Sequence, residues 1–262
     1  MSNEKNLTLG ETFNLAVQNH REGKTDIAQD LYNQVLKIDP NHSQSLNNIA
    51  VIFTNSKDYQ KAKSCYEKAI EINPNYVDAH NNLGTIFKEL EKIQKAKDCY
   101  EQAIKINPNY VNAYYNLGNI FQELREHQKA KECHEKAIEI NPNHVNAHNN
   151  LGNLFKELGE SQKAKSCYEK TIELDPNNIN ALNNLAVIFK ELGDYQKAKE
   201  CFEKAIKINP NYSSALNNLG VIFKELGENQ KAKDCFEKAI EINPDYQNAL
   251  INRGKTLFEK GE

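Results

Sequence analysis

The chain has 262 residues and a formal net charge of −3, with 33 basic and 36 acidic side chains interspersed along it. This balance provides no basic patch for nucleic acid or for an anionic membrane, and the apolar runs are too short to span a bilayer. Because the first ten residues are polar and contain no hydrophobic signal region, we expect a cytoplasmic protein that binds neither nucleic acid nor a membrane.

Proline and cysteine recur along the chain with one period of 34 residues. The prolines are Pro40, Pro74, Pro108, Pro142, Pro176, Pro210 and Pro244, and the cysteines are Cys65, Cys99, Cys133, Cys167, Cys201 and Cys235. A strict period of this length is typical of a solenoid. If proline is assigned to position 32, a lead-in of residues 1–8 precedes repeats at 9–42, 43–76, 77–110, 111–144, 145–178, 179–212 and 213–246.

Each repeat contains the pattern of two amphipathic helices, as residues 179–212 illustrate. Leu185 and Phe189 share one apolar stripe of the segment NALNNLAVIFKEL, and Phe202 and Ile206 share another in YQKAKECFEKAIKI. A Gly-Asp pair predicts the turn between them, and the proline ends the second helix because it removes a backbone donor. One helix pair cannot bury its own apolar face, so we expect neighbouring repeats to share a core.

Small residues recur where the two helices of a repeat should approach closely. They are Gly84, Gly118, Gly152 and Ala186 at position 8, and Ala96, Ala130, Ala164 and Ala198 at position 20. With aromatic residues at positions 11 and 24, alanine at 27 and proline at 32, residues 9–246 resemble the tetratricopeptide repeat (TPR) family. The resemblance implies an all-α, right-handed solenoid in which the first helix of each repeat lines a concave groove.

Two positions depart from the family pattern, and the end of the chain differs from its middle. Position 4, usually a large aromatic residue, holds Leu46, His80, Tyr114, His148, Leu182 and Leu216. Position 21, usually apolar, holds Lys63, Lys97, Lys131, Lys165, Lys199 and Lys233. Residues 247–262 have the pattern of one more first helix, with Arg253 in place of leucine. We expect either a capping helix or the start of an eighth repeat, cut from a longer protein.

The chemically reactive side chains favour no catalytic, metal or disulfide site. Equivalent cysteines of stacked repeats should lie at least about 8–10 Å apart, beyond the roughly 7 Å reach of a disulfide, and we interpret them as small buried residues. His144 and His148 could share one helix face, but no third ligand is placed beside them. Phosphate-loop, nucleophile-elbow and HExxH motifs are absent from the sequence. We therefore predict no enzyme activity, no metal and no cofactor.

Asparagines recur at neighbouring positions of the first helix, although each costs a helix about 0.5 kcal/mol relative to alanine. Position 6 holds Asn48, Asn82, Asn116, Asn150, Asn184, Asn218 and Asn252; position 5 holds Asn47, Asn81, Asn149, Asn183 and Asn217; positions 2 and 9 add Asn112, Asn146, Asn180, Asn119 and Asn153. Positions 2, 5, 6 and 9 lie on one side of a helix, which the resemblance assigns to the groove. These amides could pair with the backbone of an extended peptide, or they could hydrogen-bond within the array and keep the groove soluble.

The first interpretation favours a scaffold that binds an extended peptide or disordered segment in an asparagine-lined groove. The asparagines at position 6 resemble those in the repeat region of O-GlcNAc transferase-like proteins, and the overall resemblance includes bacterial repeat proteins that end in a transferase domain. A second hypothesis is therefore that the chain is the substrate-binding arm of a glycosyl-, sulfo- or methyltransferase. A third is end-to-end self-association through the terminal repeats. Because positions 2, 5 and 6 are nearly all neutral, we predict no lysine or arginine clamp for an acidic chaperone tail.

Overall fold

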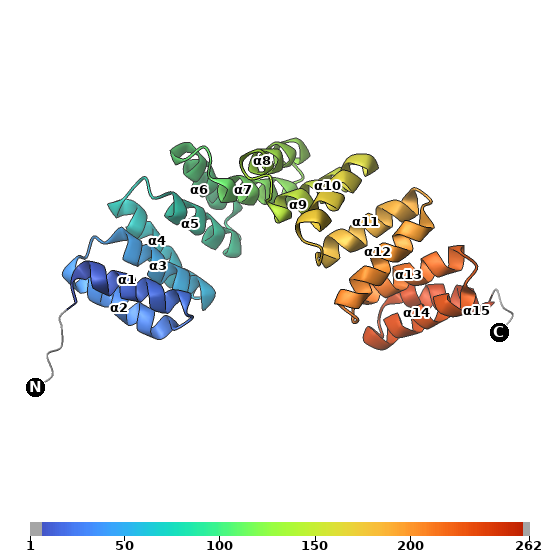
Figure 1. The fold of residues 1–262 in the computed structure, drawn as a ribbon. Helices are drawn as coiled ribbons and strands as arrows, with labels where there is room; N and C mark the ends of the chain where they lie inside the picture. The colour runs from blue at the N-terminus through green and yellow to red at the C-terminus, as the bar shows by residue number, and fades with distance from the viewer. Residues whose placement is uncertain (1–6, 259–262) are drawn as a thin grey trace, which may run out of the picture. The chain divides into compact units, whose positions relative to one another are not determined.

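A computed structural model describes residues 7–258, which form helices joined by short turns with no strand among them (Figure 1). The first helices of successive pairs are α1 (Leu9–Arg21), α3 (Ser43–Asn55), α5 (Val77–Glu89), α7 (Val111–Glu123), α9 (Val145–Glu157), α11 (Ile179–Glu191), α13 (Ser213–Glu225) and α15 (Gln247–Phe258). The second helices are α2 (Thr25–Ile38), α4 (Tyr59–Ile72), α6 (Ile93–Ile106), α8 (His127–Ile140), α10 (Ser161–Leu174), α12 (Tyr195–Ile208) and α14 (Asn229–Ile242). The all-α helix-pair architecture predicted from the sequence is confirmed.

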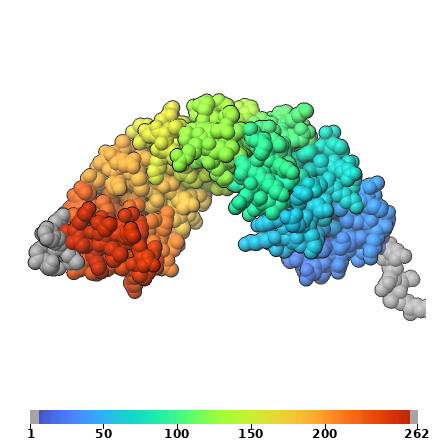
Figure 2. All heavy atoms as spheres, turned by 180° about the vertical axis from the view of Figure 1, so that it is seen from behind, coloured from blue at the N-terminus to red at the C-terminus, as the bar shows by residue number. Residues whose placement is uncertain are grey.

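The chain separates into two compact parts, an N-terminal half that ends at Lys136 and a C-terminal half that begins at Ala137, within α8. The helices that lie wholly within one half, α1–α7 and α9–α15, pack on their neighbours in the chain, and side chains fill the spaces between successive repeats of a half (Figure 2). Successive first helices also touch each other directly, as α3 and α5 do in one half and α11 and α13 in the other. Successive second helices are farther apart, so the first helices form the inner side of each stack.

Small residues at position 8 allow the two helices of a repeat to approach each other. A methyl group added at Gly84 would lie 2.7 Å from the ring of Tyr100, and one added at Gly220 would lie 2.5 Å from the ring of Phe236. Tyr100 is 1 % exposed and Phe236 is fully buried. The close approach predicted from the sequence is thereby confirmed, and the position-24 ring is the group that occupies the space.

At position 21, Lys97, Lys165 and Lys199 extend along the protein surface and place their ammonium groups over a phenylalanine ring of the next repeat. Lys97 Nζ lies 5.4 Å from the centroid of the Phe121 ring, and the Nζ of Lys129, at position 19 of the same repeat as that ring, lies 5.3 Å from it. Lys165 at position 21 and Lys197 at position 19 flank Phe189 in the same way, each at 5.5 Å. Such cation–π contacts contribute about 0.5–1 kcal/mol at exposed sites. A lysine therefore substitutes for the apolar residue of the family pattern by packing across the boundary between repeats.

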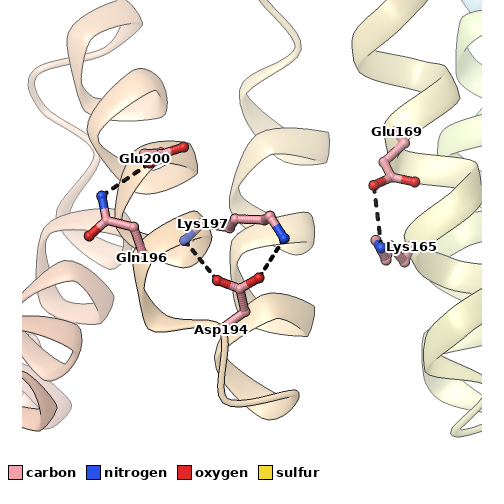
Figure 3. Close-up of polar contacts among 6 residues, drawn as sticks. All are labelled: Lys165, Glu169, Asp194, Gln196, Lys197 and Glu200. Carbon is pink, nitrogen blue, oxygen red and sulfur yellow. Dashed lines mark hydrogen bonds and ion pairs between the residues drawn. The ribbon is translucent and has the colours of Figure 1, made fainter.

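Carboxylates hold these lysines in place on the second helices (Figure 3). Lys165 forms an ion pair with Glu169 at 3.7 Å, and Lys197 forms one with Asp194 at 2.7 Å. The same pairings recur in other repeats, for example between Lys97 and Glu101 at 3.9 Å. The exposed charges of the second helices are therefore largely paired with each other, which supports the interpretation of this side as a solvated face.

The histidines at position 4 have a role that an aromatic hydrocarbon ring could not fulfil. His80 Nε2 lies 2.9 Å from the carbonyl oxygen of Pro74, and His148 Nε2 lies 2.9 Å from that of Pro142. A carbonyl oxygen can only accept, so each imidazole donates and links its helix to the end of the preceding repeat. Leu182 and Leu216 occupy the same position as buried apolar residues.

Candidate functional site

Asparagine side chains on the inner side of each half are hydrogen-bonded between neighbouring repeats. Asn116 Nδ2 donates to Asn81 Oδ1 at 3.0 Å in the N-terminal half. In the C-terminal half, Asn252 Nδ2 donates to Asn217 Oδ1 at 2.9 Å. A position-6 amide thus reaches back to a position-5 amide of the preceding repeat, and the two repeats are joined by a neutral polar contact.

The partner of the position-6 amide changes from repeat to repeat. Asn184 Nδ2 donates to Asn153 Oδ1 at 3.0 Å, which is a position-9 side chain. Asn48 Nδ2 donates instead to the hydroxyl oxygen of Tyr32 at 3.1 Å. Longer contacts of 3.3–3.4 Å join adjacent asparagines within a helix, such as Asn81 to Asn82, and recur at Asn47–Asn48, Asn149–Asn150 and Asn217–Asn218. The asparagines therefore have structural roles in stacking the repeats.

Position-2 asparagines differ because they project into solvent. Asn112, Asn146 and Asn180 are all exposed, and Asn112 is hydrogen-bonded to Tyr110. Asn146 and Asn180 have no intramolecular hydrogen bond within the described chain. The predicted site residues thus fall into two groups. Those at positions 5, 6 and 9, including Asn119, Asn150, Asn183 and Asn218, are half-buried or buried, whereas those at position 2 are exposed.

The hydroxyl groups of position-24 tyrosines also reach the inner row, which the sequence interpretation missed. Tyr168 donates to Asn153 Oδ1 at 2.9 Å, and the Tyr100 hydroxyl lies 3.3 Å from that of Thr85. Burial raises the pKa of Tyr100 to about 12, so the hydroxyl keeps its proton. Valine stands at position 9 with Phe202 and Phe236, but also with Tyr32 and Tyr66, so the sequence contained no consistent signal for this contact.

Lysines at position 12 extend the inner row by one more turn. Lys156 Nζ donates to Asn184 Oδ1 at 3.3 Å. Lys88 instead forms an ion pair of 2.5 Å with Glu123 of the next repeat. Position 12 follows position 9 by three residues and so continues the same stripe of the helix. The inner side is therefore less neutral than positions 2, 5, 6 and 9 alone indicate.

The cysteines, which we expected to be buried, are half-buried on the second helices, and His144 caps a first helix. Burial raises the pKa of the Cys99 and Cys133 thiols to about 12, so both stay protonated at neutral pH. His144 Nδ1 accepts from the backbone N–H of Ala147 at 3.1 Å and caps α9. Among the described residues, no group of three or more His, Cys, Asp or Glu side chains could hold a metal ion. Every described helix is too short or too polar to cross a bilayer.

This arrangement is that of a helical-repeat scaffold whose inner side presents polar side chains. The family profile described as tetratricopeptide repeat matches residues 43–76, 111–144, 145–178, 179–212 and 213–246. Related profiles, described as TPR repeat and tetratricopeptide repeat, match residues 84–124 and 65–98. The chain belongs to the tetratricopeptide repeat family, and it is a scaffold for protein–protein interaction.

Solved structures have the same fold. YrrB, described as a TPR protein with an unusual peptide-binding site, is 24% identical with a TM-score of 0.63, over 72% of this chain and 97% of that one. A structure from the functional characterisation of Pseudomonas aeruginosa PilF is 17% identical with a TM-score of 0.74, over 81% and 97% of the two chains. A structure of MamA is 25% identical with a TM-score of 0.57, over 63% and 97%. A comparison with curated proteins finds no match.

Proposed function

We propose that the chain binds an extended protein segment along the inner asparagine row of its repeats. The observation that carries the proposal is the exposed amide at position 2, represented by Asn146 and Asn180, which no intramolecular bond satisfies in the described chain. An uncharged amide offers one acceptor and two donors, which match the C=O and N–H groups of a peptide backbone. A row of such groups binds the backbone of a peptide, and the affinity then depends little on the peptide's sequence.

The hydrogen-bonded asparagines of positions 5 and 6 retain part of their capacity for a ligand. Asn116 Nδ2 uses one of its two hydrogens for Asn81. The second hydrogen remains for a carbonyl group of a bound segment. The intramolecular bonds also hold the side chain in one rotamer, which lowers the entropic cost of binding. A structural role and a binding role are therefore compatible at these residues.

The spacing of the repeats limits the conformation of the segment. Packed helices lie about 8–10 Å apart, and a polyproline II chain advances about 3.1 Å per residue with three residues per turn. A segment in that conformation presents the same side to successive repeats every third residue. A β-strand alternates with a period of two and would turn opposite sides to neighbouring repeats. The likeness in fold to YrrB, described as having a peptide-binding site, supports a peptide as ligand.

The test uses a library of extended 12-residue peptides and a variant that leaves the stacking contacts intact. We expect Asn146→Ala/Asn180→Ala to weaken peptide binding by about tenfold, because two hydrogen bonds of about 0.5–1.5 kcal/mol each are lost. The matched control, Asn33→Ala/Gln162→Ala, removes exposed amides from second helices and should bind like the original chain. Equal affinity of both variants, with unchanged circular dichroism, would refute the proposed function.

A further inference from the structure

One carboxylate interrupts the neutral row of position-2 side chains. Asp78 occupies this position in the third repeat, whereas the other repeats of residues 9–246 carry Gly10, Gln44, Asn112, Asn146, Asn180 and Ser214. Asp78 is exposed and is the second residue of α5. Because position 2 shares one side of the helix with positions 5, 6 and 9, a single negative charge faces any segment bound along this part of the row.

Two tyrosines flank this carboxylate. Tyr110, which precedes α7, donates its hydroxyl hydrogen to Asp78 Oδ1 at 2.6 Å. Tyr76, which precedes α5, is half-buried, and burial, followed by the charge of Asp78, raises the pKa of its phenol to about 12. Burial also raises the pKa of Tyr110, and the hydrogen bond to Asp78 adds to the increase. Both phenols therefore keep their protons at neutral pH, and the site carries one negative charge.

The hydroxyl of Tyr110 links the position-2 groups of two successive repeats. It is hydrogen-bonded to Asn112 as well as to Asp78. Since its one hydrogen goes to the carboxylate, its oxygen accepts from the amide of Asn112. This bridge holds Asp78 in place but does not saturate it. A carboxylate has about four lone-pair sites, so most of its accepting capacity remains for a ligand.

The charge of Asp78 has no basic partner among the described residues. Other aspartates of the chain are paired with lysines, as Asp58 is with Lys61 at 2.8 Å and Asp194 is with Lys197 at 2.7 Å. An acidic residue in the first turn also interacts favourably with the N-terminus of its helix, which carries about half an elementary positive charge. That interaction offsets part of the negative charge, and the remainder faces solvent.

We propose that Asp78 binds a basic side chain of the extended segment, so that the row selects segments with an arginine or lysine over neutral or acidic ones. The inference rests on the proposed function, since it names a specificity-determining residue for the same ligand. Asp78 accepts charge-assisted hydrogen bonds from the guanidinium or ammonium group, and Tyr110 positions it. The sign of this charge is opposite to that of a clamp for an acidic chaperone tail, which agrees with the prediction that the chain has none.

The experiment compares two fluorescent 12-residue peptides with blocked ends, which are neutral except for one central arginine that citrulline replaces in the second peptide. Citrulline keeps the shape of arginine and removes its charge. Contacts with the peptide backbone do not fix the register, so the arginine can reach Asp78. We expect the arginine peptide to bind about fivefold more tightly at low salt, as for one exposed ion pair. Equal affinity, or tighter binding of the citrulline peptide, overturns the inference.

Substitutions assign the preference to Asp78. Asp78→Asn keeps the shape of the side chain and should abolish the preference for arginine, while the affinity for the citrulline peptide stays the same. The matched control is Asp26→Asn, which removes an exposed carboxylate from the second residue of α2, outside the inner row, and should leave the preference intact. A preference that survives Asp78→Asn, or that Asp26→Asn reduces equally, overturns the inference.

The seventh repeat allows a test by gain of function. Ser214 occupies position 2 between two position-34 tyrosines, Tyr212 and Tyr246, which is the same sequence environment as that of Asp78. Ser214→Asp, introduced into the Asp78→Asn variant, should restore a preference of about fivefold. No recovery, at unchanged helix content, would overturn the assignment of the preference to a carboxylate between two tyrosines.

A small probe separates failure of this site from failure of the proposed function. N-acetylarginine amide carries the cation but is too short to follow the row, and N-acetylcitrulline amide is its neutral control. We expect only the arginine compound to shift the ring resonances of Tyr110 in NMR titrations, and only when Asp78 is present. That result supports the site even if no longer peptide binds. Peptide binding without any Tyr110 shift supports the row and overturns the site.

Discussion

Three turns between the helices of a repeat contain a residue in an unfavourable backbone conformation. Lys57, Glu91 and Arg125 have φ of 60°, 56° and 58°, in the left-handed region. The equivalent residue in other repeats is glycine, for example Gly193 with φ of 76°. A side chain in this region costs about 1–2 kcal/mol, whereas glycine has no such cost. We therefore expect replacement of each of the three by glycine to stabilise the fold.

The net gain is the strain released minus the entropy that glycine adds to the unfolded chain. That entropy costs about 0.4–1 kcal/mol, which leaves a gain of about 0.5–1 kcal/mol at each position. All three side chains are exposed and their replacement removes no described contact. Because the sites lie in different repeats, their effects should add. The triple variant Lys57→Gly/Glu91→Gly/Arg125→Gly should gain about 2 kcal/mol, or about 5 °C in the midpoint of thermal unfolding.

The reverse substitution provides the control. A methyl group at Gly193 would meet no atom within 4 Å, so Gly193→Ala tests the backbone alone and should cost about 0.5–1 kcal/mol. Thermal and urea unfolding, followed by circular dichroism, measure both variants. An unchanged or lower midpoint for the triple variant, at unchanged helix content, would refute the reasoning that these turns store strain.

Three further predictions concern the inner row and the buried polar groups. Tyr168→Phe should cost about 1 kcal/mol in urea unfolding, because Asn153 loses the 2.9 Å hydroxyl donor; no change would mean that the bond is dispensable. Burial lowers the pKa of His144 in the folded chain below its ordinary 6.5. As the pH falls, the unfolded chain therefore takes up the proton at a higher pH than the folded chain, and the free energy of unfolding should decline below a pH of about 6.5. His144→Asn keeps a capping side chain and should reduce that decline, and an equally steep decline would contradict the assignment. Cys99 should resist iodoacetamide in the folded chain at pH 8, since burial raises its pKa to about 12; rapid labelling seen by mass spectrometry would contradict this.

The helices and their pairing could be predicted because they depend on local patterns. The 34-residue spacing of proline, the apolar stripes and the small residues at position 8 each act over one repeat or less. The packing of Lys97 against Phe121 could not be predicted in the same way, since the two side chains meet only across the boundary between repeats. From the sequence, Lys97 could be identified only as a residue that departs from the family pattern.

For the asparagines, too, the sequence predicted some features and the tertiary structure determined others. Helical periodicity alone determined that positions 2, 5, 6 and 9 share one side, because that side follows from 3.6 residues per turn. Tertiary structure decided which amides are already engaged. Asn116 bonds to Asn81, whereas Asn184 bonds to Asn153, since each partner depends on the residues that the neighbouring helix presents at hydrogen-bond distance. The tertiary structure also brings Arg21, Tyr32 and Asn48, which belong to three different helices, to one pocket. A short-range periodicity is a property of the chain, whereas a contact between repeats exists only once they stack.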